Sequence, residues 1–201
     1  MMKRLAAPAL LLAILAGPAV PAMPAHAHGA VATATSGAIG GPFVLTDHTG
    51  KTVTEKIFLG KPFLVYFGFT SCQDVCPVTL SSVAQALDMG GEGVTDIQVL
   101  FITVDPDHDT PDVMKNYVSA IHPRLVGLTG SPGQIQNALK AYRVYAAPAE
   151  DHTGGHGSRR MNHSDMVFLM MPDGNFHDVV AGSTSPADMN RTFRNLVAPA
   201  S

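Results

Sequence analysis

The segment Lys61–Leu80 has the sequence KPFLVYFGFTSCQDVCPVTL, which predicts a buried strand, a loop with two cysteines and the start of a helix. Its run FLVYF is apolar throughout and rich in aromatic and β-branched side chains, as in strands buried on both faces. Pro77 suits the first turn of a helix, and apolar residues recur at helical spacing after it. We therefore expect a central strand followed by a helix, with Cys76 at the helix N-cap and Cys72 in the loop before it.

The rest of the chain alternates between apolar runs and helical patterns. A hairpin is expected at 42–54, around a turn at Asp47–Gly50. Further strands are expected at 97–104, 125–128, 166–171 and 177–181, and helices at 111–121, 134–141 and 186–197. The order strand, helix, strand implies parallel crossovers and an α/β domain. Residues 146–161 are irregular, which favours a long exposed loop.

The length of 201 residues fits one domain, and the apolar fraction of 46% fits a globular protein. The formal net charge of −3 becomes −5 if residues 1–27 are removed, because Lys3 and Arg4 are then lost. A nucleic-acid partner is disfavoured, since the sequence has no concentration of basic residues that would bind phosphates.

The N-terminus has the three parts of a secretory signal: a basic start, an apolar run at 5–15 and a small-residue stretch that ends at Ala27. We predict a signal peptide at 1–27, cleaved after Ala27. The alternative is an uncleaved membrane anchor, although Pro8 and Pro18 leave the apolar run short of the roughly 20 residues that span a bilayer.

Residues 28–40 are small, polar and aperiodic, and predict a flexible tether. The folded domain is therefore expected at 41–198. An exported chain places this domain outside the cytoplasm, and we expect the bacterial periplasm, with anchoring to the inner membrane if the leader is retained.

The sequence has two cysteines, Cys72 and Cys76. They could form a structural disulfide, but closing so short a loop restricts the unfolded chain little. Their expected place at a helix N-terminus favours a redox-active or metal-binding pair, because the helix dipole and unpaired N–H groups stabilise a thiolate. Two thiolates favour Cu(I), and imidazole is a common third ligand.

Among nine histidines, His163 is the best candidate for this ligand, because it stands where the expected loop enters the strand at 166–171. Sequence spacing alone leaves other histidines open. His152 and His156 in the loop could help capture copper, although an exposed polar loop is the simpler interpretation. Thioether ligands are a further alternative, although methionines on and beside a buried strand more often pack in the core: Met161, Met166, Met170 and Met171.

Three blocks of the sequence resemble the signature sequences of the Sco/SenC family of copper-binding assembly proteins. They are the segment 61–80, ITVDPDHDTPDVMKNYV at 102–118 and NHSDMVFLMMPDG at 162–174. The resemblance runs in order from about Gly41 to Leu196. It implies a thioredoxin-like fold, with a central mixed sheet flanked by helices and an N-terminal hairpin, in agreement with the element order above.

The resemblance also implies a site. Cys72, Cys76 and His163 match the copper ligands of the family, and Asp105 matches an acidic residue that supports the site from nearby. Members of the family deliver Cu(I) or Cu(II) to the binuclear copper site of cytochrome c oxidase, or reduce its cysteines. The expected partner is thus the copper-site subunit of that oxidase or another periplasmic copper protein, and a thioredoxin-like reductant is a second partner to consider.

Three residues depart from the family pattern: Gln73 replaces a proline, His108 an arginine and Asn162 an aspartate. The absence of an aspartate at position 162 is expected to affect the copper affinity and the reduction potential more than the identity of the ligands. The main rival to a metallochaperone is an exported thiol-disulfide oxidoreductase that uses the two cysteines. A peroxide-reducing enzyme fits less well, because it leaves the second cysteine and His163 without a task.

Overall fold

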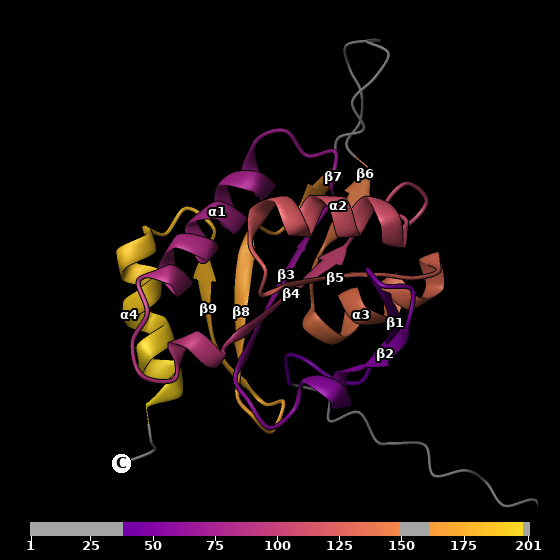
Figure 1. Ribbon diagram of the computed structural model, residues 1–201. Coiled ribbons are helices and arrows are strands. Elements are labelled where there is room, and N and C mark those ends of the chain that lie inside the picture. The colour runs from indigo at the N-terminus through magenta and orange to yellow at the C-terminus, as the bar shows by residue number, and fades with distance from the viewer. Residues whose placement is uncertain (1–37, 149–160, 199–201) are drawn as a thin grey trace, which may run out of the picture. The chain divides into compact units, whose positions relative to one another are not determined.

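The computed structural model describes residues 38–148 and 161–198 (Figure 1). The strands are β1 (Val44–Asp47), β2 (Thr52–Thr54), β3 (Phe63–Gly68), β4 (Gln98–Thr103), β5 (Leu125–Thr129), β6 (Ala146–Pro148), β7 (Met161–His163), β8 (Met166–Met170) and β9 (Phe176–Ala181). The α-helices are α1 (Val75–Asp88), α2 (Pro111–Ile121), α3 (Pro132–Tyr142) and α4 (Pro186–Val197). Two short 3-10 helices are η1 (Glu55–Phe58) and η2 (Val94–Asp96).

Within this part of the chain, seven strands form a mixed sheet in the order β2-β1-β5-β4-β3-β8-β9. The central strands β3, β4 and β5 are parallel, as their connections through α1 and α2 require. β8 runs antiparallel to β3, and β9 antiparallel to β8. The expected N-terminal hairpin is present and joins the sheet through β1, which pairs with β5.

Aromatic side chains of β3 connect the sheet to helices on both of its faces. Tyr66 stacks on Phe101, which in turn stacks on Tyr117 of α2. The next residue of β3, Phe67, points to the opposite face and packs against Tyr142 of α3. The run FLVYF is therefore buried on both faces, as its composition predicts.

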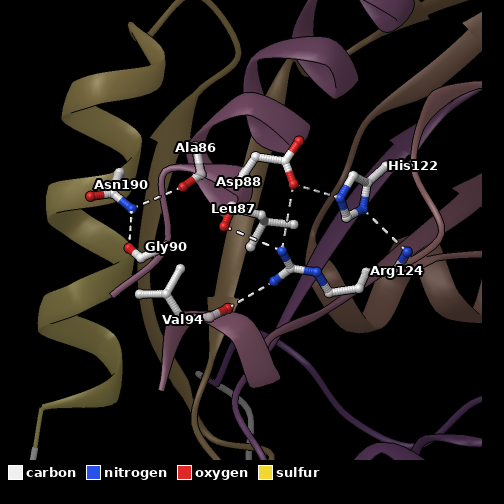
Figure 2. A network of polar contacts seen from close by, with 8 residues as sticks. All are labelled: Ala86, Leu87, Asp88, Gly90, Val94, His122, Arg124 and Asn190. Carbon is white, nitrogen blue, oxygen red and sulfur yellow. Dashed lines mark hydrogen bonds and ion pairs between the residues drawn. The ribbon is translucent and has the colours of Figure 1, made fainter. Parts of the chain in front are cut away.

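The C-terminal end of α1 is fixed by polar contacts from neighbouring elements, and α4 lies alongside this helix (Figures 1 and 2). Asn190 of α4 donates hydrogen bonds to the carbonyl oxygens of Ala86 and Gly90. Arg124 donates to the carbonyl oxygens of Leu87, near the end of α1, and of Val94 in η2. These contacts hold the C-terminal end of α1 in place. The first turn of the helix lies at its opposite end.

The structure corrects two sequence predictions. The helix begins at Val75, with Asp74 as its N-cap residue, so Cys76 lies inside the first turn and not at the N-cap. The segment predicted as one loop begins and ends in paired strands, because β6 pairs antiparallel with β7. His152 and His156 lie outside the described residues, as do the predicted signal peptide and most of the predicted tether. In the ranges 38–148 and 161–198, none of the helices has the length and apolar character needed to cross a membrane.

Candidate metal centre

The fold brings together the three side chains that the sequence indicates as ligands. The Sγ atom of Cys76 lies 3.4 Å from Nε2 of His163, although 87 positions separate the two residues. The backbone N–H of Cys76 donates to Sγ of Cys72 at 3.4 Å. Both cysteines are free thiols, and Cys76 is buried while Cys72 is half-buried. The two sulfurs and the imidazole nitrogen therefore form one cluster at the start of α1.

His163 reaches Cys76 because two strand pairings fix its position. In β7 it lies opposite Ala146 of β6, and shortly after it the chain enters β8, which pairs with β3. The imidazole ring packs edge-on against Tyr66 and Phe69, with ring centroids 6.3 and 5.9 Å away. These contacts restrict the ring to an orientation that faces the cysteine.

The hydrogen bond on the far side of the ring fixes the tautomer of His163. Its Nδ1 lies 3.2 Å from the carbonyl oxygen of Ser164, and a carbonyl can only accept. The proton of a neutral ring is therefore on Nδ1, which leaves the lone pair of Nε2 directed at Cys76. This is the form in which histidine binds metals, with its second nitrogen held by a backbone carbonyl.

Burial raises the pKa of the Cys76 thiol to about 12, and the neighbouring Cys72 thiol adds to this effect. A hydrogen bond with the backbone of Phe69 acts in the opposite direction but is outweighed. The prediction that a helix N-terminus would favour the thiolate is therefore wrong for Cys76, because desolvation of the charged form dominates. A metal ion that binds this sulfur must displace its proton.

The donor set fits a soft metal ion. Two sulfurs and one neutral imidazole nitrogen are the ligands that favour Cu(I). Among the residues that the structure describes, no three His, Cys, Asp or Glu side chains are already arranged to hold a metal ion. Coordination by all three side chains would therefore require side-chain movement, and Cys72 is the less buried of the two cysteines.

Asp105, the acidic residue expected to support the site, is buried and bound to its own loop. Its carboxylate lies 2.9 Å from Nδ1 of His108, and its backbone N–H donates to Oγ1 of Thr103. The structure thus pairs it with the histidine that replaces the arginine of the family pattern. A role for Asp105 at the metal stays a prediction.

Two other carboxylates, which the sequence analysis did not single out as site residues, bind residues that lie next to the candidate ligands. Asp109 accepts hydrogen bonds from the backbone N–H and the hydroxyl of Thr70, two residues before Cys72. Asp165 accepts from the hydroxyls of Tyr66 and Thr79, which flank Cys76. Both acids lie in blocks quoted above for the family resemblance, but only the tertiary structure shows which groups they bind.

Other candidate ligands lie elsewhere or have other partners. Met170 is fully buried in the core, as expected for a methionine on a central strand. Nδ1 of His48 accepts a hydrogen bond from the backbone N–H of Gly127, and His122 lies 3.0 Å from the carboxylate of Asp88 (Figure 2). Within residues 38–148 and 161–198, His163 is the histidine that forms a hydrogen-bond contact with a cysteine.

Comparison with known proteins places this chain in a family. Residues 31–198 match the family model described as SCO1/SenC. The chain is 42% identical over 147 residues to the mitochondrial SCO1 homolog of Homo sapiens, an alignment that covers 70% of this chain and 46% of that protein. It is 40% identical over 151 residues to protein SenC of Rhodobacter capsulatus, covering 75% of this chain and 67% of the relative. The chain thus spans about half the length of the human protein.

A solved structure supports the fold. The structure of Bradyrhizobium japonicum ScoI with copper bound is similar with a TM-score of 0.71 and 39% identity, over 80% of this chain and 100% of that one. The mixed sheet flanked by helices is thus the thioredoxin-like fold that the sequence predicts.

Proposed function

Because the chain belongs to the SCO1/SenC family, we propose that it is a copper-binding metallochaperone with Cys72, Cys76 and His163 as its ligands. The observation that carries this proposal is the 3.4 Å approach of Cys76 Sγ to His163 Nε2, with Cys72 Sγ beside them. Copper is the cargo in this proposal. The copper-bound structure of the similar ScoI protein supports it.

The proposed destination is the binuclear copper site of cytochrome c oxidase, which the chain would load or prepare by reducing its cysteines. A chaperone must release its metal, and a site of three ligands leaves a coordination position through which a partner's ligand can enter. The half-buried Cys72 is the ligand most open to such an approach. The copper-site subunit of the oxidase is the partner we propose.

The proposed location is the periplasm. The charged, apolar and small-residue parts of the N-terminus support export through a signal peptide at 1–27. In this arrangement residues 28–40 form a tether, and residues 41–198 form the copper-binding domain.

The oxidoreductase alternative has weaker support from the structure. Disulfide exchange starts with attack by a thiolate, and the pKa of Cys76, raised to about 12 by burial, keeps its thiol protonated at neutral pH. Only the more exposed Cys72 is suited to attack a partner disulfide. A metal ion, by contrast, can displace the proton of Cys76 as it binds.

The test is an anaerobic titration of the reduced protein with Cu(I) against a competing chelator. We expect one copper per chain, and loss of this binding in Cys72→Ser and in Cys76→Ser, because one thiolate and one imidazole do not complete the soft set. Retention of full affinity by either variant, or rapid disulfide exchange without copper binding, would reject the proposal.

A further inference from the structure

The hydroxyl of Tyr66 stands between a proposed ligand and a carboxylate. Tyr66 is fully buried in β3, and its hydroxyl donates to Oδ1 of Asp165 at 3.0 Å. The ring of Tyr66 also lies beside Cys76, because one Cβ atom placed on Gly68 would lie 2.9 Å from the Cys76 sulfur and 3.3 Å from Cε1 of Tyr66. The Tyr66 side chain therefore lies near the sulfur of Cys76 while its hydroxyl binds Asp165.

A second hydroxyl holds Asp165 in place. Thr79 of α1 is buried three residues after Cys76 and donates to the same oxygen, Oδ1 of Asp165, at 3.0 Å. Gly182 closes the group, because a Cβ atom there would overlap both the Asp165 carboxylate and the Thr79 hydroxyl. Its backbone N–H also donates to the carbonyl oxygen of Asp165. The Tyr66, Thr79 and Asp165 side chains thus form a compact hydrogen-bonded cluster behind the site.

The hydrogen bonds of this cluster change once a metal ion has displaced the thiol proton of Cys76. Tyr66 has one hydroxyl proton, and the thiol form of Cys76 does not compete strongly for it. The metal-bound thiolate does compete, so that two anions then face one donor. Thr79 can continue to satisfy Asp165, which frees the Tyr66 hydroxyl to turn to the sulfur.

We propose that Tyr66 donates a hydrogen bond to the metal-bound sulfur of Cys76, and that Asp165, by competing for this proton, sets the balance between Cu(II) and Cu(I). This inference rests on the proposed function and concerns the tuning of the copper site. A hydrogen bond to a coordinated thiolate withdraws electron density from the metal and favours Cu(I). The nearby negative charge of Asp165 favours Cu(II), both directly and by holding the proton away.

The two residues therefore act in opposite directions, and this gives a sharp test. The reduction potential of the copper-loaded protein is measured in Tyr66→Phe and Asp165→Asn, together with the sulfur-to-Cu(II) charge-transfer band. Tyr66→Phe should lower the potential and shift the band to lower energy, because the sulfur loses its donor. Asp165→Asn should raise the potential and shift the band to higher energy. We expect about a tenfold change in the Cu(II)/Cu(I) ratio at fixed potential, equivalent to about 59 mV for one electron.

The control is Tyr142→Phe, which removes the hydroxyl of another buried tyrosine on the opposite face of the sheet and should leave the potential unchanged. Near-UV circular dichroism and melting curves of the copper-free variants check the fold. If Asp165→Asn does not fold, Thr79→Val replaces it: Asp165 then depends on Tyr66 alone, and the potential should fall as in Tyr66→Phe.

Shifts in the same direction for Tyr66→Phe and Asp165→Asn, or no shift in folded variants, would overturn the inference and leave the proposed function standing. If the wild-type protein binds no copper at these ligands, the proposed function and the inference both fail.

Discussion

Gly68 and Cys76 approach each other so closely that a Cβ atom on Gly68 would lie 2.9 Å from the sulfur. The same atom would lie 2.9 Å from the ring of Phe101 and 3.3 Å from that of Tyr66. Neither ring has free space, because both are fully buried in the core. The last residue of β3 therefore leaves room for the thiol that we propose as a metal ligand.

We expect Gly68→Ala to weaken Cu(I) binding by displacing Cys76 and to destabilise the fold by about 1–3 kcal/mol, as overpacking does. Competition titration measures the affinity, and urea unfolding of the copper-free protein measures the stability. The matched control is Gly133→Ala in α3, where an added Cβ meets no atom within 4 Å. Wild-type copper affinity in folded Gly68→Ala would show that the sulfur has more freedom than this packing allows.

Asp109 is almost completely buried and accepts three hydrogen bonds, two from Thr70 and one from the hydroxyl of Thr103. Asp109→Asn should destabilise the protein by about 1–3 kcal/mol. The amide N–H₂ of the asparagine would replace one accepting oxygen and would face a threonine group that also donates. It should also reduce Cu(I) affinity, since Thr70 belongs to the loop that carries Cys72. Urea unfolding and copper titration test both effects against Asp107→Asn on the exposed side of the same loop. An unchanged unfolding free energy would show that Asp109 does not hold this loop.

The copper-free protein should lose stability in alkali. Burial raises the pKa of Cys76 from 9.0 to about 12, so the folded state holds the thiol proton more tightly than the unfolded state. The resulting contribution is complete below about pH 9 and is lost as the pH rises toward 12. Chemical denaturation between pH 8 and pH 12 measures this loss.

The variant Cys76→Ser isolates the thiol in that experiment, because the buried Tyr66 and Tyr142 also have raised pKa values and add their own loss. The stability of the wild-type protein should fall more steeply than that of the variant. Parallel curves would indicate that the Cys76 thiolate is accommodated in the folded protein.

His163→Ala separates the two leading functions. Copper coordination needs the imidazole as a direct ligand, whereas disulfide exchange needs only two accessible cysteines. We therefore expect a strong loss of Cu(I) affinity with largely intact exchange of the Cys72 and Cys76 thiols. His177→Ala on the exposed part of β9 is the control.

Two other results for His163→Ala would change the interpretation. Collapse of the exchange reaction would indicate that His163 tunes a thiol or donates a proton, in favour of a reductase. Unchanged copper affinity would exclude His163 as the third ligand.

The sequence predicts the order of the elements because these depend on local patterns, whereas the choice of His163 beside the two cysteines comes from the family resemblance. Pro111 and Pro186 each begin a helix where the pattern places one, and the run FLVYF forms the central strand. The thiol chemistry of Cys76 was not predictable in the same way, because its pKa depends on burial by distant residues. The contacts of Asp109 and Asp165 likewise join residues 39 and 99 positions apart, a separation that only the fold bridges.

The pairing of Ala146 with His163 also bears on how this protein can vary. Strands β6 and β7 pair where the segment 149–160 begins and ends, and the proposed ligand His163 lies in β7, at the second of these points. The entropy cost of closing a connecting segment grows only slowly with the length of that segment. Insertions and deletions between β6 and β7 should therefore be tolerated among related sequences. The pairing of the two strands holds the His163 imidazole in place when the length of the segment between them changes.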